Sequence, residues 1–472
     1  MAWEAMIEHH ELAGRLLEGA RLIAICAPPG FGKTLAVQSA IELSSNRPCF
    51  TTKVWRATME LAGQDSLARL FETADQNHLI IADGVDRLEI RELAIALDAS
   101  RPGPNGPRII LTARDPSKMP IARFLATDDA ELIDWRMLAQ STDKLRAQSA
   151  RVPGKFRRPF SDLSEGWPVA AQLLSAWAQS AQPEEAEWPY IDIVTASGLA
   201  AFIEQEVEPM FTEDELDLLV RASVVETTTV SSRNARETRP PQHAGLSKLA
   251  HRFAGLINRQ GHVVRMQPAF RVFLLQKFSE LAMPQQLKVL QSAALEKAQS
   301  GKLGQAARLL RQANLPNHIE QLVAEHGSLK IWMDYGFAVV QEIVEQCEDV
   351  VIDGSPTLSL MKCIVLMKTG RISEAQALFE RIEDHPPTES LFDRDREIVR
   401  VTLLVYGCGL QRDDDLERFR GIVAQNVGEP SWRSLMSTLL CILNGQRAQF
   451  DAAVAALVDA RMHARSANST YN

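Results

Sequence analysis

Eight consecutive residues near the N-terminus have the types and the spacing that hold a polyphosphate. The segment Ala27-Pro-Pro-Gly-Phe-Gly-Lys-Thr34 follows an apolar run, Leu22–Cys26, and precedes a stretch of helical character that begins at Leu35. Phosphates are multiply charged and strongly hydrated, so binding them requires many donors at close range. The N–H groups of a glycine-containing loop at a helix N-terminus supply such donors. The segment matches the P-loop pattern, with Ala27 in the place of the first glycine.

The P-loop residues have separate expected roles toward a bound nucleotide. Lys33 is expected to reach the β- and γ-phosphates as a flexible point charge, and Thr34 to place its hydroxyl on Mg²⁺. The alternative is a chance glycine-rich turn, but the strand and the helix that the motif requires both flank this segment. The sequence therefore predicts an ATP or ADP site with Mg²⁺, and its nucleotide-binding residues are Ala27, Pro28, Pro29, Gly30, Phe31, Gly32, Lys33 and Thr34.

An acid at the end of a second apolar run completes the expected metal site. Leu79-Ile-Ile-Ala-Asp83 has the form of a Walker B strand, in which apolar residues bury the strand and the carboxylate helps to hold Mg²⁺. Asp83 is therefore a candidate catalytic residue and, with Thr34, a candidate metal ligand. Gly84 stands where an efficient ATPase usually has a second acid, so we expect hydrolysis to be slow or absent. Asp86 is either a partial substitute for that acid or a surface or capping carboxylate.

One arginine is expected beside the terminal phosphate. Arg114 follows the apolar run Arg108-Ile-Ile-Leu-Thr112 and belongs to Thr-Ala-Arg-Asp-Pro116. At the end of a parallel strand its guanidinium would lie next to the γ-phosphate and detect that charge through charge-assisted hydrogen bonds. The alternative is a surface ion pair. We therefore include Arg114 with Asp83 among the candidate catalytic residues.

The elements that would position these residues alternate between strands and helices. Over residues 1–155, short β-like runs alternate with amphipathic helices, which is typical of a parallel sheet covered by helices. The candidate strands are Leu22–Cys26, Leu79–Ala82 and Arg108–Thr112, and polar or turn residues follow each of them. A parallel sheet places its ligand at such ends, so the three ends are expected to share one crevice. The predicted fold of this part is an α/β P-loop NTPase domain.

Two further domains are expected after residue 155. The stretch 151–159 is rich in Pro, Gly and Arg, which break helices, so we expect a linker or a mobile basic loop there and place the first boundary at it. Residues 156–284 are expected to form a helical and winged-helix-like domain. Within it, residues 227–242 are rich in Thr, Ser, Arg and Pro and are expected to be a loop. Over residues 285–472 helices come in pairs, as in a tetratricopeptide-like superhelix.

Related segments support the repeat prediction. Residues 301–306 and 370–375 each have a glycine, a basic residue, an apolar residue, two further positions and an alanine, which indicates a tight turn into the second helix of a hairpin. Gln449–Leu457 is a third and weaker copy. A helical array needs a polar cap at each end, and the sequence up to Asn472 offers none, so we expect a truncated array.

Length, charge and cysteine content argue against several classes of protein. With 472 residues the chain is too long for one core, and three or so domains are expected. A formal net charge of -9 argues against a generally basic surface that coats nucleic acid. The six cysteines have no C-x-x-C spacing, which favours reduced thiols. The sequence has neither a signal peptide nor an apolar run of the ~20 residues that cross a bilayer, so a cytoplasmic location without membrane contact is expected.

Several of these segments resemble, in order, the landmarks of MalT-like regulators, which are signal-transduction ATPases with numerous domains (STAND proteins). The segments are the P-loop, Leu79–Asp83, Thr112–Pro116 and Ser164-Glu-Gly-Trp-Pro-Val-Ala-Ala-Gln-Leu173. The likeness continues at Arg265–Leu274, which looks like the winged-helix module that packs on the nucleotide in that family. It reaches the repeats and so covers nearly the whole chain.

The resemblance implies a nucleotide-dependent transcriptional regulator of the LuxR type. In that family ADP holds the protein closed, and a small inducer bound to the helical repeats favours exchange for ATP and self-association. A C-terminal LuxR-type helix-turn-helix then binds promoters. The resemblance therefore implies that the repeats bind a small-molecule inducer or a protein. The 472 residues include no helix-turn-helix, so we expect the chain to be the N-terminal portion of such a regulator and DNA binding to belong to a segment outside it.

Three departures from the family pattern accompany the resemblance. Gly84 replaces the second acid, Gln267 stands where a histidine is common, and only 50 positions separate Lys33 from Asp83. Two other functions stay open. One is a P-loop enzyme whose ATPase activity acts on a bound partner, and the other is a scaffold whose repeats bind proteins while the nucleotide is a structural ligand. At most a weak, regulatory ATPase activity is expected.

Overall fold

The structure of the protein, a computed structural model, divides into two compact units, Met1–Leu281 and Ala282–Asn472. The division lies between α14 (Pro268–Glu280) and α15 (Met283–Gln299), and the first unit continues across residue 155. The three-domain division at residues 155 and 284 stays a prediction. The residues that the structure describes are 12–45, 51–56, 67–100, 106–229, 241–383, 390–406, 416–417, 419–421, 423 and 430–467.

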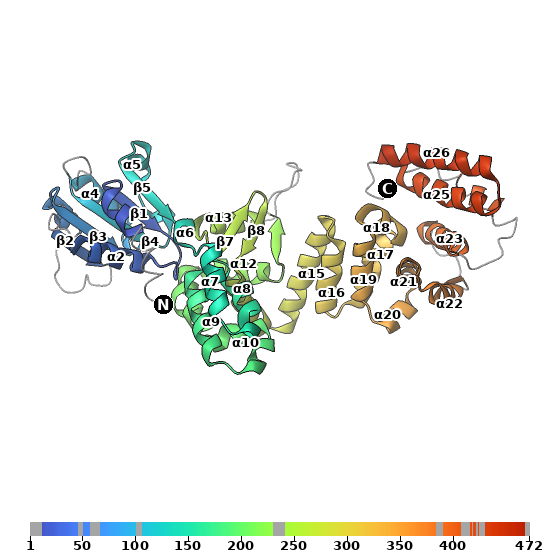
Figure 1. Cartoon of the computed structure of the whole chain (residues 1–472), viewed down its shortest axis with the longest axis horizontal. Helices are drawn as coiled ribbons and strands as arrows, with labels where there is room; N and C mark the ends of the chain where they lie inside the picture. Colours follow the sequence, from blue (N-terminus) through green and yellow to red (C-terminus); the bar gives the residue numbers. More distant parts are fainter. Residues whose placement is uncertain are drawn as a thin grey trace. The chain divides into compact units, whose positions relative to one another are not determined.

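A five-stranded parallel sheet is the centre of the N-terminal part of the first unit (Figure 1). Its strands are β1 (Leu22–Cys26), β2 (Thr51–Arg56), β3 (His78–Asp83), β4 (Arg108–Ala113) and β5 (Ala130–Asp134). Their order is β2-β3-β4-β1-β5, and all four pairings are parallel. The three inner strands are nearly continuous apolar runs because both of their faces are buried. These are the three strands that the sequence predicts.

The two edge strands, β2 and β5, were missing from the sequence prediction. Both are half-exposed and mix polar with apolar residues, so neither forms the continuous apolar run that marks an inner strand. Helices α3 (Leu67–Glu72) and α4 (Ile90–Ala99) cover one face of the sheet with buried side chains that include Phe71 and Leu97. Helix α2 (Lys33–Ser45) follows β1 directly. The short elements here are η2 (Val85–Arg87), η3 (Pro116–Lys118) and α5 (Ala122–Ala126).

Helices and a small antiparallel sheet complete the first unit. The helices that come first are α6 (Trp135–Leu138), α7 (Thr142–Arg151), η4 (Gly154–Phe156), α8 (Arg157–Ser164), α9 (Pro168–Ser180), η5 (Pro183–Glu187), α10 (Tyr190–Ala196), α11 (Leu199–Phe202), η6 (Ile203–Val207, a π-helix) and η7 (Glu208–Met210). A winged-helix-like part follows, with α12 (Glu213–Ser223), β6 (Thr227–Thr229), α13 (Pro241–Arg252), β7 (Ile257–Gln260), β8 (Val263–Met266) and α14. Its strands pair antiparallel in the order β6-β8-β7.

Two local expectations need correction. The segment 227–242 is not a loop throughout, because Thr227–Thr229 pairs with β8 and α13 begins at Pro241; residues 230–240 lie outside the described part. The second correction concerns 151–159, which is helical for most of its length although it is rich in residues that break helices. Pro and Gly there start short helices, and the apolar side chains of Val152 and Phe156 are buried.

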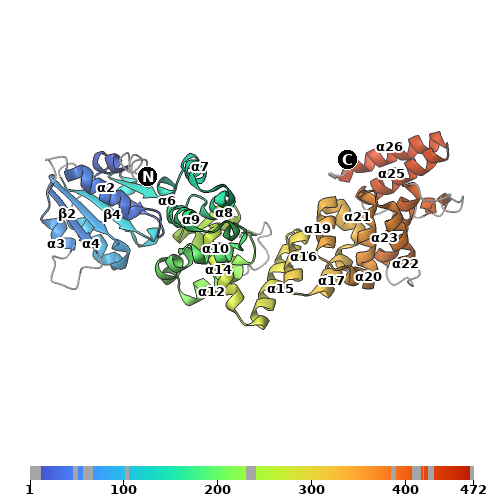
Figure 2. The same cartoon turned by 60° about the horizontal axis from the view of Figure 1, so that its bottom comes forward.

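The second unit is built from helices that follow one another in chain order (Figure 2). Successive helices pack in pairs, such as α15 with α16 and α25 with α26, and the pairs pack on their neighbours. None of the described helices in either unit meets the length and hydropathy needed to span a bilayer. The helices after α15 are α16 (Leu303–Gln312), α17 (Pro316–His326), α18 (Ser328–Tyr335), α19 (Phe337–Glu345), α20 (Asp349–Gly354), α21 (Pro356–Lys368), α22 (Ile372–Glu383), α23 (Ser390–Val405), α25 (Pro430–Gln446) and α26 (Phe450–Ala467).

The three related segments of the repeats form the same turn. At 301 and 370 a glycine with φ of 76° and 80° ends the first helix, and the next N–H donates to a carbonyl five residues back. This is the Schellman arrangement, which favours glycine because its backbone is left-handed. The third copy makes the same bond, from Gln449 N–H to the Asn444 carbonyl, but Ala448 takes the left-handed position with φ of 55°. The weak copy therefore keeps the turn and bears a conformational cost.

We expect Ala448→Gly to stabilise the second unit by about 0.5–1 kcal/mol, because a left-handed non-glycine residue costs roughly 1–2 kcal/mol and part of that is offset by the greater entropy of unfolded glycine. Urea unfolding monitored by circular dichroism measures the change. Gly370→Ala is the matched control, since an added Cβ there meets no atom within 4 Å. It should destabilise by a similar amount, and a destabilised Ala448→Gly protein would contradict the assigned turn.

Candidate nucleotide-binding site

A cleft of about 1190 Å³ lies at the carboxyl edge of the parallel sheet. The P-loop, the ends of β2, β3 and β4, and residues of α6, α7, α9 and η6 line it. Because β4 runs between β1 and β3, its end lies between the P-loop and Asp83. Ala27 and Pro28 are buried and line no part of the cleft. The other predicted site residues line it together, namely Pro29, Gly30, Phe31, Gly32, Lys33, Thr34, Asp83 and Arg114.

The Lys33 side chain lies across the P-loop. Its Nζ donates to the carbonyl oxygens of Ala27 at 2.5 Å and Pro28 at 3.0 Å. Burial, and next the positive charge of Arg114, lower the pKa of Lys33 to about 8. Lys33 and Thr34 are the first two residues of α2, whose opening N–H groups have no helical partners and are suited to bind an anion.

The outer side of the P-loop is bound by the start of α9. The buried indole of Trp167 donates from Nε1 to the Pro29 carbonyl at 3.1 Å, and the N–H of Val169 donates to the Gly30 carbonyl at 3.1 Å. Gly30 has a φ of 79°, and an added Cβ would lie 2.9 Å from Trp167 Nε1. Trp167 is therefore both a buried packing residue and, through its N–H, a fixed support for the loop backbone.

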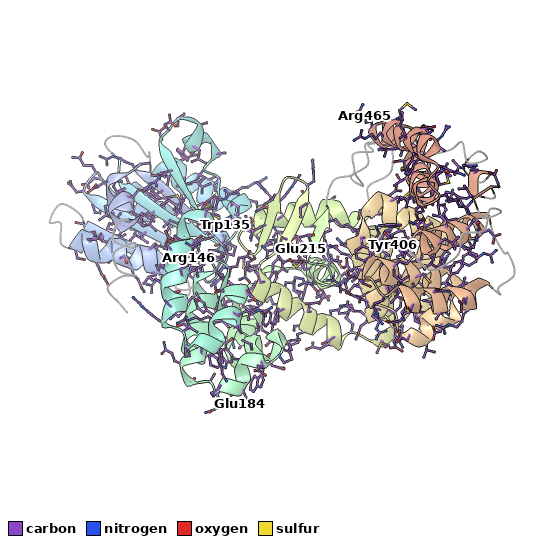
Figure 3. All side chains as sticks on the ribbon, turned by 45° about the vertical axis from the view of Figure 1, so that its right-hand side comes forward. Trp135, Arg146, Glu184, Glu215, Tyr406 and Arg465 are labelled. Atoms are coloured by element: carbon purple, nitrogen blue, oxygen red, sulfur yellow. The ribbon has the colours of Figure 1, made fainter. Side chains whose placement is uncertain are left out.

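Phe31 anchors the tip of the loop in an aromatic cluster. Its ring is only 2% exposed and packs edge-on against Trp135 (labelled in Figure 3), with 6.0 Å between ring centroids, and parallel to Trp167 at 6.5 Å. A Cβ added to Gly255, which precedes β7, would lie 2.8 Å from the Phe31 ring. The loop thus contacts both the helical and the winged-helix-like parts of the unit.

Thr112 joins Asp83 to the strand between Asp83 and the P-loop. Its hydroxyl donates to Asp83 Oδ1 at 2.5 Å and accepts from the N–H of Gly84 at 2.9 Å. Thr112 is buried, so these bonds fix the carboxylate at the cleft. Sequence reasoning treated Thr112 only as a strand end. The available signal was a single hydroxyl in an otherwise apolar inner strand.

The two residues that follow β4 form ion pairs with later parts of the unit. Arg114 donates to Glu206 Oε2 at 2.9 Å and to the Glu206 carbonyl at 3.3 Å, on η6. Asp115 accepts from Arg252 Nε of α13 at 3.0 Å, and Arg252 also donates to Glu215 of α12 at 2.5 Å (Glu215 is labelled in Figure 3). Burial would raise the pKa of Asp115, but hydrogen bonds from Ser117 and Arg252 outweigh it and lower the pKa.

Gln267 lies away from the cleft. It is 2% exposed, its amide donates to the carbonyls of Leu163 and Ser164 at the end of α8, and its oxygen accepts from Phe270 N–H at the start of α14. Where the resembled family commonly has a histidine, this chain therefore has a residue that joins α14 to α8. Of the residues of α12, α13 and α14 that the structure describes, none lines the cleft.

The residues of the cleft fit a nucleotide with Mg²⁺. The P-loop places an ammonium and helix N–H groups on one side, and Asp83 lies beyond β4. Within the described ranges no three His, Cys, Asp or Glu side chains are grouped so that they could hold a metal ion. Mg²⁺ usually takes one or two protein ligands together with water and phosphate oxygens. Thr34 and Asp83 would therefore hold the ion together with a nucleotide, and the phosphates would supply the remaining charge.

The sheet topology and the loop define a P-loop NTPase fold, joined to a winged-helix-like part and a unit of helical repeats. No family model matches the sequence, and no curated protein matches it significantly.

Three examples represent the solved structures that are similar to the chain. A STAND protein with a tetratricopeptide repeat sensor from Pyrococcus horikoshii shares 12% identity, with 97% of this chain and 76% of that chain covered and a TM-score of 0.38. A Walker-type ATPase of Pyrococcus abyssi shares 13% identity over 57% of this chain and 95% of that one, with a TM-score of 0.40. Cdc6p from Pyrobaculum aerophilum shares 12% over 58% and 94%, with a TM-score of 0.26. At these TM-scores the likenesses have no bearing on function.

We expect ATP affinity to fall as the pH rises through about 8, by up to tenfold per pH unit, because only the charged form of Lys33 attracts phosphate and its pKa in the free protein is about 8. Isothermal titration calorimetry from pH 7 to 9.5 measures the change. Lys33→Arg is the control, since arginine stays charged over this range and should bind with little pH dependence. Constant affinity of the unaltered protein up to pH 9.5 would show that Lys33 has an ordinary pKa.

We expect Trp167→Phe to weaken nucleotide binding by about tenfold, because the Pro29 carbonyl loses its buried donor and the loop becomes less ordered; a loss of about 1.4 kcal/mol corresponds to that factor. Calorimetric titration with ADP measures it. Trp177→Phe is the matched control, because Trp177 lies on α9, the helix that Trp167 precedes, and packs on Phe156. Equal affinities of the two variants would contradict a role of the indole N–H.

Proposed function

We propose that this chain is a nucleotide-dependent switch of the STAND type, which binds ATP or ADP with Mg²⁺ in the cleft. The main support is the segment Thr112–Asp115 at the end of β4. Thr112 hydrogen-bonds Asp83 in the cleft, while Arg114 and Asp115 form ion pairs with η6 and α13. A nucleotide can bias a domain arrangement only through contacts that differ between states, and this segment offers such contacts.

Each site residue has a place in this proposal. The P-loop residues bind the phosphates, Thr34 and Asp83 hold Mg²⁺, and Arg114 exchanges Glu206 for the γ-phosphate when ATP is present. The Arg114–Glu206 pair is partly exposed, at 31% and 47%, so it is worth only about 0.2–1 kcal/mol and can be exchanged easily. Gly84 provides no side chain to polarise water, so turnover is slow and resets the switch.

The finer assignment is a regulator of the MalT and LuxR type in the cytoplasm. The repeats of the second unit bind a small-molecule inducer or a protein, ATP favours self-association, and DNA binding depends on a helix-turn-helix outside these residues. The sequence resemblance and the helical-repeat architecture of the second unit support this part of the proposal.

The primary test identifies the nucleotide. The protein is purified without added nucleotide, and mass spectrometry of the denatured sample determines what it retains. Retained ADP supports a resting switch, and calorimetry with ATP and ADP should detect binding that Lys33→Ala abolishes. No heat with either nucleotide and Mg²⁺ overturns the proposal. Steady turnover of many per second would indicate a P-loop enzyme instead.

We expect Glu206→Gln to accelerate ADP release up to about fivefold, because loss of a pair worth up to ~1 kcal/mol loosens the contact between the β4 end and η6. Stopped-flow displacement of a fluorescent ADP analogue measures the rate. Glu204→Gln, on the same π-helix, removes an exposed charge that contacts Lys277 at 3.8 Å and not Arg114. If both variants release ADP at the same rate, the Arg114–Glu206 pair does not couple the two parts.

A further inference from the structure

A second arginine lies at the phosphate end of the cleft. Arg56 is the last residue of β2, pairs in register with Asp83 on β3, and lines the cleft. Its neighbour Trp55 is buried, whereas the Arg56 side chain is exposed. Within the described ranges the Arg56 guanidinium makes no hydrogen bond or ion pair.

Two other cations of the cleft, unlike Arg56, are hydrogen-bonded to other groups of the protein. Arg114 gives both of its terminal nitrogens to Glu206, and Lys33 donates to the carbonyls of Ala27 and Pro28. Gly84, which follows the register partner of Arg56, adds no side chain that could neutralise it. Although the register partner Asp83 is an acid, no ion pair joins the two side chains, so among the described residues the planar set of donors of Arg56 is left for a ligand.

The sheet order decides which part of a nucleotide Arg56 would meet. β2 is the neighbour of β3 on the side away from β4 and β1, so Arg56 and the P-loop approach the cleft from opposite sides of Asp83. A phosphate chain that starts on the P-loop and extends toward Asp83 brings its terminal group nearest to Arg56. Guanidinium groups match phosphate oxygens with two parallel hydrogen bonds, which an ammonium cannot do.

We propose that Arg56 binds the terminal phosphate of a nucleoside triphosphate and thereby sets the preference for ATP over ADP. This inference rests on the proposed nucleotide site. It assigns the preference for ATP to a residue of an edge strand, in addition to the exchange of Arg114 between Glu206 and the γ-phosphate.

The test compares ATP and ADP affinities of the full chain by isothermal titration calorimetry with Mg²⁺. Arg56→Ala should lower ATP affinity by about tenfold and leave ADP affinity within about twofold. Arg56→Lys should restore only part of the loss. Arg91→Ala, which removes an exposed arginine of α4 outside the cleft, should leave both affinities unchanged.

The outcomes separate this inference from the proposed function. If the unaltered protein binds neither nucleotide, both fall. If it binds both, and Lys33→Ala abolishes binding while Arg56→Ala leaves the ATP to ADP ratio unchanged, only the role of Arg56 is overturned. The same holds if Arg87→Ala alone changes the ratio, because Arg87 also lines the cleft after β3. A circular dichroism melt of each variant checks that it is folded.

Discussion

The position of β4 between β1 and β3 is the constraint on which the site depends. It sets the end of β4 against the P-loop, where Ala27 N–H donates to the Ala113 carbonyl at 3.3 Å, and against Asp83 through Thr112. The next two residues, Arg114 and Asp115, pair with the helical and winged-helix-like parts. The four residues 112–115 therefore contact the P-loop, Asp83, and the helical and winged-helix-like parts of the unit.

The P-loop is held by hydrogen bonds on one side and offers N–H groups to the cleft on the other. Its carbonyls at Pro29 and Gly30 accept hydrogen bonds from Trp167 and Val169 on the outer side, and the start of α2 directs N–H groups to the cleft. Binding a phosphate at the start of α2 therefore need not break these two hydrogen bonds, although Lys33 would have to leave the Ala27 and Pro28 carbonyls to reach it. Conversely, any displacement of α9 pulls on the backbone of the loop. The loop and the start of α9 are thus joined by buried hydrogen bonds. Losing one of them would leave a buried polar group without a partner, at a cost of roughly 1–3 kcal/mol.

The sequence was sufficient for the inner strands and the P-loop pattern but not for the contacts between distant segments. Inner strands such as β1 are marked by continuous apolar runs, and the repeats by recurring glycines at 301 and 370. The edge strand β2 has no such mark, so Arg56 was not considered. Glu206, Arg252 and Trp167 reach the site only through the packing of segments far apart in the chain, which no local pattern encodes. The role of Gln267 was not predictable for the same reason, because its amide donates to a carbonyl at the end of α8, far from it in the chain.

The charges of the cleft favour holding a nucleotide over hydrolysing it. Among the described residues that line it, the acids are Asp83, Asp86 and Glu206. Asp83 is hydrogen-bonded to Thr112 and would hold Mg²⁺, and Glu206 is paired with Arg114 in the absence of a γ-phosphate. A base must reach the water it deprotonates, and glycine at position 84 removes the nearest place from which a side chain would do so. Lys33 would attract phosphates that are present before and after hydrolysis, and uniform binding of this kind does not accelerate chemistry. In the proposed switch, a site that binds well and turns over slowly would keep its occupant long enough for the second contact of the β4 end, with α13, to respond to it.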